Sequence, residues 1–315
     1  MGVEVVVVGS CNTDLIAYVP RLPARGETIT GTRFENHYGG KGANQAVMAS
    51  RLGSKVAMVT CLGADYFGEG YLSNLNNLGI DCTHVTRTTD ASTGVAQICV
   101  DEQGANFIAI VPGANHVLSP EDVAMAGSGL KGARVMLCQL EVRAQTTLAA
   151  LELGVAEGML TIFNPAPADP NLSNRFLELS DVVCVNETEL MLLCSREVDT
   201  ESEESVHQAA LELIARGAKA LVVTLGEKGA LLVSTDSPEV YKVFPAREVD
   251  AVDTVGAGDA FLGSLGAYLG RGLRLDEAVC KAVRIASLSV EHKGAQASFP
   301  SHSDLPQDLQ LPEMP

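Results

Sequence analysis

The segment Asp253-Thr-Val-Gly-Ala-Gly-Asp259 lies just ahead of a stretch with the apolar spacing of a helix. Glycines before a helix leave backbone amides free, and together with the helix dipole these amides form an anion-binding hole. Gly256, Ala257 and Gly258 would supply the amides. Asp259, in the first turn, would accept a proton from an alcohol late in a reaction, as a new P–O bond forms. A glycine-containing helix start, with an aspartate favoured by the dipole, is the purely structural alternative.

A second glycine-rich segment, Gly39-Gly-Lys-Gly-Ala-Asn44, also precedes a helical stretch. Gly39 and Gly40 allow the backbone to come close to a ligand, and Lys41 and Asn44 offer hydrogen-bond donors. Such donors suit a polyhydroxylated ligand as well as a phosphate. A helix start with a solvent-facing lysine is the alternative. Neither glycine-rich segment matches the P-loop or the dinucleotide-binding pattern.

Polar residues also follow several apolar runs. Asn12 and Asp14 come after the run Glu4–Gly9 and, being two residues apart, share a face of an extended chain. A carboxylate and an amide can bind sugar hydroxyls, although an Asx turn explains the pair equally well. A carboxylate or amide at a strand end can also hold a metal or its bound water, and three more residues have such a position: Glu141, Asn186 and Glu189.

Two further segments are weaker candidates. The turn Thr224–Gly229 contains Gly226 and would let the backbone approach a nucleotide, but it also reads as an ordinary hairpin turn. The segment Lys293–Ser298 follows a long helical stretch and would supply carbonyl oxygens; on its own it indicates little.

The elements that must position these residues alternate between strand and helix. Six apolar runs have strand length: Glu4–Gly9, Val56–Leu62, Val135–Leu140, Leu160–Phe163, Val182–Val185 and Ala220–Leu225. Helical spacing is found at Ala43–Leu52, Thr146–Ala156 and Val206–Arg216. This alternation predicts an α/β fold with a central, mostly parallel sheet and helices on both faces. Ligands of such sheets bind at the carboxyl ends of the strands.

Two inserts, 15–38 and 93–115, interrupt the alternation. The second contains two strand-like runs around a polar loop, which predicts a hairpin. We expect the two inserts to pair into a small β-sheet lid over the site, with loops of no function as the alternative. The whole chain, 1–315, is expected to form one domain.

Composition narrows the function classes. The 315 residues carry a net charge of −17 and are 46% hydrophobic. So acidic a surface disfavours binding to nucleic acid or to an anionic membrane, and an anionic ligand must be held by amides, a lysine or a metal. No apolar run approaches the roughly 20 residues of a membrane-spanning helix, and no signal peptide is evident. Eight cysteines without a C-x-x-C pair predict reduced, mostly buried thiols. We therefore expect a cytoplasmic protein; a nuclear location is also compatible.

Taken together and in this order, the motifs resemble those of the ribokinase family of sugar kinases, also called PfkB carbohydrate kinases. The resemblance extends from Glu4 to about Pro300, and its most specific parts are the segments 39–44 and 253–259. It implies ATP-dependent phosphorylation of D-ribose at its 5-hydroxyl. A related family kinase for another sugar or a nucleoside is the alternative, and a sugar-binding protein without catalysis is a further one.

The resemblance also assigns residues. Asp259 would be the catalytic base, and Gly256, Ala257 and Gly258 would form the anion hole. The ribose-binding residues would be Asn12, Asp14, Gly40, Lys41, Gly42, Ala43, Asn44, Glu141 and Asp259. The ATP-binding residues would be Asn186, Thr224, Leu225, Gly226, Glu227, Lys228, Gly229, Gly258 and Asp259. No signature identifies an adenine pocket.

For metals and partners, the resemblance implies Mg²⁺ bound with ATP, with Glu189 acting indirectly, and K⁺ as a monovalent activator. The K⁺ would be bound, mostly through backbone carbonyls, by Asp253, Val255, Ser289, His292, Gly294 and Ser298. It also implies a homodimer that assembles through the lid.

Overall fold

A computed structural model describes residues 2–313. Within them a nine-stranded sheet has the spatial order β13 (Lys242–Phe244), β12 (Ala230–Ser234), β11 (Ala220–Thr224), β10 (Val182–Asn186), β9 (Leu160–Phe163), β8 (Val135–Cys138), β1 (Val5–Val8), β4 (Val56–Gly63) and β5 (Val85–Thr88). Neighbouring strands are parallel from β11 to β5, whereas β12 is antiparallel to both its neighbours. The predicted mostly parallel sheet is confirmed, and the run 135–140 forms a strand only as far as Cys138.

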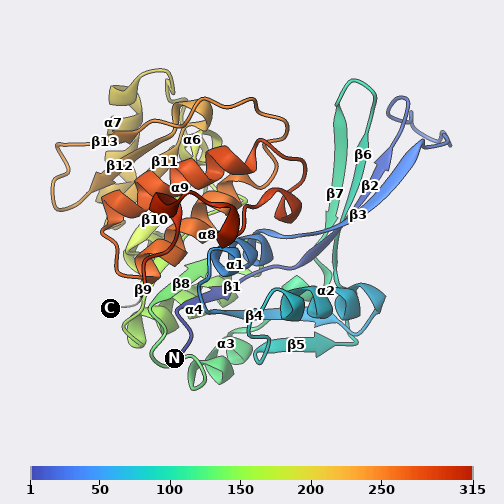
Figure 1. Cartoon of the computed structure of the whole chain (residues 1–315), viewed down its shortest axis with the longest axis horizontal. Coiled ribbons are helices and arrows are strands. Elements are labelled where there is room, and N and C mark those ends of the chain that lie inside the picture. The colour runs from blue at the N-terminus through green and yellow to red at the C-terminus, as the bar shows by residue number, and fades with distance from the viewer. Residues whose placement is uncertain (1, 314–315) are drawn as a thin grey trace.

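Helices cover both faces of this sheet, as predicted (Figure 1). Val5 and Val7 of β1 pack into a core with α1 (Lys41–Arg51), α2 (Tyr66–Asn77), α8 (Ala257–Gly270) and α9 (Leu275–Ser289). Val6 and Val8 point to the opposite core, which contains residues of α3 (Pro120–Gly127), α4 (Ala144–Ala156), α5 (Asn174–Glu178), α6 (Glu187–Cys194) and α7 (Glu203–Ala215). Because successive strand residues face opposite sides, β1 is apolar at every position.

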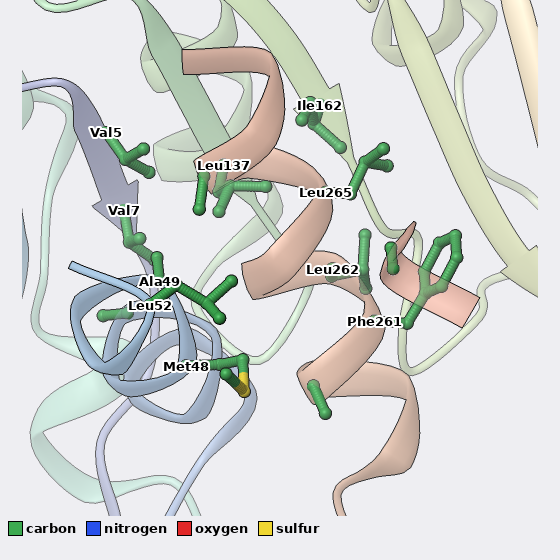
Figure 2. Close-up of a cluster of buried hydrophobic side chains, with 14 of the residues drawn as sticks. Val5, Val7, Met48, Ala49, Leu52, Leu137, Ile162, Phe261, Leu262 and Leu265 are labelled. Carbon is green, nitrogen blue, oxygen red and sulfur yellow. The ribbon is translucent and has the colours of Figure 1, made fainter. Parts of the chain in front are cut away.

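Helices α1 and α8 pack against each other and against the sheet (Figure 2). Phe261, Leu262 and Leu265 of α8 are buried in the same core as Met48 of α1. A Cβ atom at Gly263 would collide with the backbone oxygen of Gln45, so the two helices approach each other more closely than any larger residue would permit. This close packing places the first turn of α8 beside α1.

A second sheet of four strands has the order β3 (Arg33–Gly39), β2 (Asn12–Tyr18), β6 (Gly94–Val100) and β7 (Asn106–Val111). β2 is antiparallel to β3 and parallel to β6, and β6 and β7 form an antiparallel hairpin. The two inserts therefore pair with each other, and their sheet stands away from the nine-stranded body (Figure 1). Strand β2 starts at Asn12 rather than at residue 15, so Asn12 and Asp14 lie at the base of this sheet.

Short 3-10 turns complete the chain: η1 (Gly113–His116), η2 (Gly226–Lys228), η3 (Gln296–Ser298), η4 (His302–Asp304) and η5 (Gln307–Leu309). The segment after Ser298 packs onto the core, where Leu305 and Leu309 are buried and the Tyr268 hydroxyl donates to the Leu309 carbonyl. No helix within residues 2–313 is long and apolar enough to span a bilayer. All eight cysteines are free thiols, and Cys280 is the one that is exposed.

Candidate active site

The carboxyl ends of the parallel strands border a cleft of about 180 Å³. Strands β9, β10 and β11 bring Asn164, Asn186 and Thr224 to its edge. Helices α1 and α8, which pack in the core of Val5 and Val7, contribute most of the rest of its lining together with α6. Its lining consists of Lys41, Asn164, Cys184, Val185, Asn186, Glu189, Thr224, Gly256, Gly258, Asp259, Phe261 and Leu262. The cleft therefore joins residues from four of the predicted motifs at the expected edge of the sheet.

The start of α8 faces this cleft. Gly256 is its N-cap with φ of 81°, a left-handed conformation that favours glycine. Among the described residues, the Gly256 and Gly258 amides donate to no backbone carbonyl, as expected for a free first turn. The amide of Ala257 does donate to Thr254, at 3.2 Å. Of the three predicted anion-hole amides, two are therefore free and one is engaged within the protein.

The first turn of α1 differs in this respect. The Lys41 amide donates to Glu141 at 2.9 Å, the Ala43 amide to the Ser10 carbonyl at 2.9 Å, and the Gly42 amide to the Ser10 hydroxyl at 3.3 Å. Because these amides already have partners, the segment 39–44 does not form a second anion hole. It positions the side chains of Lys41 and Asn44.

Asp259 is 8% exposed, and both of its carboxylate oxygens accept hydrogen bonds from α1. Asn44 Nδ2 donates to Oδ2 at 2.9 Å, and Gln45 Nε2 donates to Oδ1 at 3.0 Å. The charge of Asp259 also acts on the pKa of Lys41. Burial alone would lower the pKa of Lys41, but Asp259, Glu141 and Glu189 together raise it above its ordinary value. The site thus holds a fixed carboxylate beside a positively charged ammonium group.

The predicted sugar-binding carboxylates lie around the base of the second sheet. The Ser10 hydroxyl donates to Glu141 Oε2 at 2.6 Å, and Asn115 Nδ2 donates to Asn12 Oδ1 at 2.7 Å. Asp14 lies against Gly39, where a Cβ atom would collide with its carboxylate. Burial, aided by the charge of Glu141, raises the pKa of Asp14 to about 7. A hydroxyl group that donates a hydrogen bond to this carboxylate would stabilise its ionised form.

On the opposite side of the cleft, Asn186 caps α6 in a reciprocal arrangement with Glu189. Glu189 Oε2 accepts from the Asn186 amide at 2.9 Å, and burial raises the pKa of Glu189. Thr224 is the part of the predicted ATP turn that lines the cleft. Leu225 is buried, Glu227 is exposed, and Lys228 Nζ pairs with Glu201 at 2.6 Å, away from the cleft. Gly226 has φ of 54°, and Gly229 packs against the Phe244 carbonyl, so both serve the backbone of the turn.

Residues 3–302 match the model of the pfkB family carbohydrate kinases. The chain belongs to this family. It is 44% identical over 304 residues to a ribokinase from Mus musculus, covering 96% of this chain and 93% of the relative. It is 41% identical over 310 residues to a deoxyribokinase from Salmonella typhi, covering 98% of this chain and all of the relative. A structure of Arabidopsis thaliana ribokinase complexed with ribose and ATP superimposes with a TM-score of 0.88 at 29% identity, covering 99% of this chain and 100% of the other.

This pfkB-family chain is accordingly a phosphotransferase, and the resemblance inferred from its motifs is confirmed, as is the fold. Six further predicted residues lie in the loop before α8 or in the chain from the end of α9 onward. Asp253 Oδ2 accepts from the Gly294 amide at 2.8 Å, and Asp253 Oδ1 accepts from the Val255 amide at 3.0 Å. These bonds join the loop before α8 to the loop after α9.

Four other predicted cation-binding positions have varied environments. Ser289 and Ser298 are buried, whereas His292 and Val255 are exposed. The Ser289 carbonyl accepts from the His292 amide at 3.3 Å. Within residues 2–313, no cluster of three histidine, cysteine or acidic side chains has the arrangement of a metal site. A site made of backbone carbonyls needs no such cluster, and the K⁺ assignment stays a prediction.

Four side chains of this kinase site were not predicted from the sequence: Gln45, Asn115, Asn164 and Gln296. Asn164 directly follows the apolar run 160–163, so the strand-end criterion that selected Asn186 would also have selected it. Gln296 bridges Asn44 Oδ1 at 3.0 Å and the Tyr71 hydroxyl at 3.2 Å. No local pattern marks Gln45 or Asn115, because each acts on a residue more than 100 positions away.

Proposed function

We propose that this kinase transfers the γ-phosphoryl group of ATP to the 5-hydroxyl of D-ribose. The observation that carries the proposal is the position of Asp259, whose carboxylate lines the cleft between Lys41 and the free amides of α8. An alcohol at this carboxylate would be next to the first turn of α8, whose free amides suit a transferring phosphoryl group. The mouse relative named ribokinase and the Arabidopsis ribokinase complexed with ribose and ATP support the choice of substrates.

The proposed mechanism gives each group one task. Asp259 accepts the proton of the 5-hydroxyl as the new P–O bond forms, because a carboxylate is too weak a base to remove it earlier. The Gly256 and Gly258 amides stabilise the negative charge that spreads over the phosphoryl oxygens. Lys41 supplies a positive charge to the same region, and Asn44 orients the base through its hydrogen bond to Oδ2.

The sugar would be bound by Asn12, Asp14 and Glu141. The Asn12 amide has its oxygen occupied by Asn115, so its N–H groups are left to donate to a sugar oxygen. Asp14 and Glu141 accept from sugar hydroxyls. Such hydrogen bonds favour the ionised form of Asp14, which burial disfavours in the free protein.

We assign the divalent metal that accompanies ATP to Mg²⁺ and place it near Asn186 and Glu189. Glu189 Oε2 accepts from the Asn186 amide, and Glu189 Oε1 would act on the metal indirectly, by accepting a hydrogen bond from a water bound to it. When bound, the metal neutralises phosphate charge. We place K⁺ at the joined loops of Asp253 and Gly294, where its charge would support the anion hole.

We further propose that the four-stranded sheet is a lid and that two copies of the chain associate through it in the cytoplasm. Strand β7 is exposed at all six positions, with Phe107, Ile108 and Ile110 exposed by 63%, 50% and 57%. Phe34 on β3 is 64% exposed. An apolar surface of this kind is typical of a protein interface. The remaining chain, with the lid inserted, is proposed to form one domain.

A second candidate substrate is 2-deoxy-D-ribose, because the Salmonella typhi relative at 41% identity is named deoxyribokinase. The test is ADP release from the purified protein with ATP, Mg²⁺ and K⁺ against ribose, 2-deoxyribose, fructose and adenosine. We expect the highest kcat/KM with ribose, since a buried carboxylate that loses its hydroxyl donor is left unpaired. A higher kcat/KM with 2-deoxyribose would assign the second activity, and no turnover with any of the four would refute the proposal.

A further inference from the structure

The carboxylate of Asp259 is held from the protein interior by Gln45, a residue that has no part in the mechanism above. We propose that Gln45, oriented by Gln139, is a positioning residue for the catalytic base. The inference rests on the proposed function, because it assumes that Asp259 is the base. Gln45 is fully buried, so it cannot contact either substrate and can act only through its neighbours.

The hydrogen bonds define which way the Gln45 amide points. Gln139 Nε2 donates to Gln45 Oε1 at 2.6 Å, and Gln45 Nε2 donates to Asp259 Oδ1 at 3.0 Å. An amide group exposes an acceptor at one end and donors at the other. Since Gln139 occupies the acceptor end, the donor end is directed at Asp259. The two hydrogen bonds therefore run in the same donor-to-acceptor direction, from Gln139 through Gln45 to Asp259.

The backbone packs closely around these three side chains. The missing side chain of Gly263 lets α8 approach the Gln45 backbone, and Gly263 lies one turn after Asp259 on α8. Gly9 leaves room for the side chain of Gln139, because a Cβ atom at Gly9 would collide with Gln139 Oε1. Two glycines therefore hold the three side chains within hydrogen-bonding distance.

The arrangement also has a cost that a simple core would avoid. Gln139 Oε1 is buried and has no hydrogen-bond partner among the described residues. An apolar side chain at position 139 would remove this unpaired oxygen, and an apolar pair at 45 and 139 would remove every polar atom of the chain behind Asp259. A buried polar pair that is unfavourable for packing and directed at the reactive carboxylate points to a role in the reaction.

That role follows from what the donors do to the carboxylate. Asn44 holds Oδ2 and Gln45 holds Oδ1, which fixes the plane of the group and leaves its remaining lone pairs for the cleft. Both donors are N–H groups, so they orient the carboxylate without supplying the proton that it is proposed to accept from the sugar. The other ionisable groups that interact with Asp259 are Lys41 and Glu189. Neither is a hydrogen-bond partner of Gln45, so substitution of Gln45 tests the amide alone.

The experiment uses Q45M, in which methionine keeps the length of the side chain and loses the donor, and Q139M, which leaves the donor but removes what orients it. Steady-state kinetics with ribose and ATP are measured for each variant, with ribose binding measured by calorimetry and folding by thermal unfolding. For Q45M we expect kcat to fall about tenfold to a hundredfold, as for loss of a charge-assisted hydrogen bond. The Kd for ribose should stay within about twofold, so the loss should fall on kcat and not on substrate binding.

Q139M should show a smaller change in the same direction, and the double variant should resemble Q45M because both residues act along one path. A role in packing alone would lower the unfolding temperature and leave kcat of the folded variant within about twofold of wild type, and this outcome would overturn the proposal. If Q45M does not fold, Q139M, which removes an unpaired buried oxygen, decides the question by the same comparison of kcat with the Kd for ribose. Loss of the proposed function is distinguishable, since the wild-type enzyme itself would then turn over no sugar, and the role of Gln45 would be refuted with it.

Discussion

Replacement of Asp14 by asparagine should stabilise the free enzyme at neutral and alkaline pH while weakening its binding of ribose. Burial, with a contribution from the charge of Glu141, raises the pKa of Asp14 from 3.8 to about 7 in the folded protein. The unfolded chain releases this proton near pH 4, whereas the folded chain retains it to about pH 7. Asp14 therefore opposes folding at the pH where the enzyme works.

The magnitude follows from linkage. A shift of about 3 pKa units corresponds to about 4 kcal/mol at roughly 1.4 kcal/mol per unit. Because the side chain is only partly removed from water, we expect about half of this value. The sign is that of a raised pKa: stability is fully present below pH 3.8, falls as the pH rises toward 7, and stays lower above it. Asparagine has no titratable proton, so the free energy of unfolding of the variant does not decrease in this way as the pH rises.

The assay is urea unfolding of ligand-free wild type and D14N at pH 5 and pH 8. The comparison cancels other titrating groups, and D14N should gain about 1 to 2 kcal/mol relative to wild type between the two pH values. Its Kd for ribose should rise at least about tenfold, because a neutral amide replaces an anionic acceptor. A stability difference that is the same at both pH values, or that favours wild type more at pH 8, would refute the reasoning about burial.

Three further predictions concern the reaction and the assembly. D259N should lower kcat by roughly a hundredfold to ten-thousandfold with little change in the Kd for ribose, and a near-normal kcat in rapid-quench or coupled assays would remove Asp259 as the base. Replacing K⁺ by tetramethylammonium should lower kcat at least about fivefold if a cation supports the anion hole next to Asp253, whereas equal rates in the two salts would argue against any monovalent site. Substituting Phe107 and Ile110 by aspartate should convert a dimer into a monomer in analytical ultracentrifugation; an unchanged sedimentation coefficient would exclude the β7 face as the interface.

The sheet and its flanking helices were predictable because their signal is local. Each buried parallel strand reads as a continuous apolar run, and β1 is apolar at all four positions because it separates two cores. The pairing of the two inserts was also accessible, since each had strand character without a place in the alternation. The start of β2 at Asn12 could not be predicted. The residue types do not change where the chain passes from one sheet to the other.

The site was predictable only where residues sit at the ends of elements. Asp259, Asn186 and Thr224 were selected in this way, and the structure brings them to one cleft. Lys228 shares a glycine-containing turn with Thr224 but forms an ion pair with Glu201, a contact between residues 27 positions apart that the turn itself does not indicate. Gln45 and Asn115 could not be selected, since their function depends on partners that only the fold brings near.

The charges of the site explain how so acidic a protein can handle a phosphoryl group. Lys41 interacts with three acidic side chains, those of Asp259, Glu141 and Glu189, so its charge is already shared before an anionic ligand binds. The start of α8 contributes only about half a positive charge. ATP brings several more negative charges, and one lysine and one helix cannot offset all of them. Bound cations would supply the missing positive charge, which is why we place Mg²⁺ near Asn186 and Glu189 and K⁺ beside Asp253. The net charge of −17 is thus compatible with phosphoryl transfer if Lys41, the start of α8 and bound cations act together at the cleft.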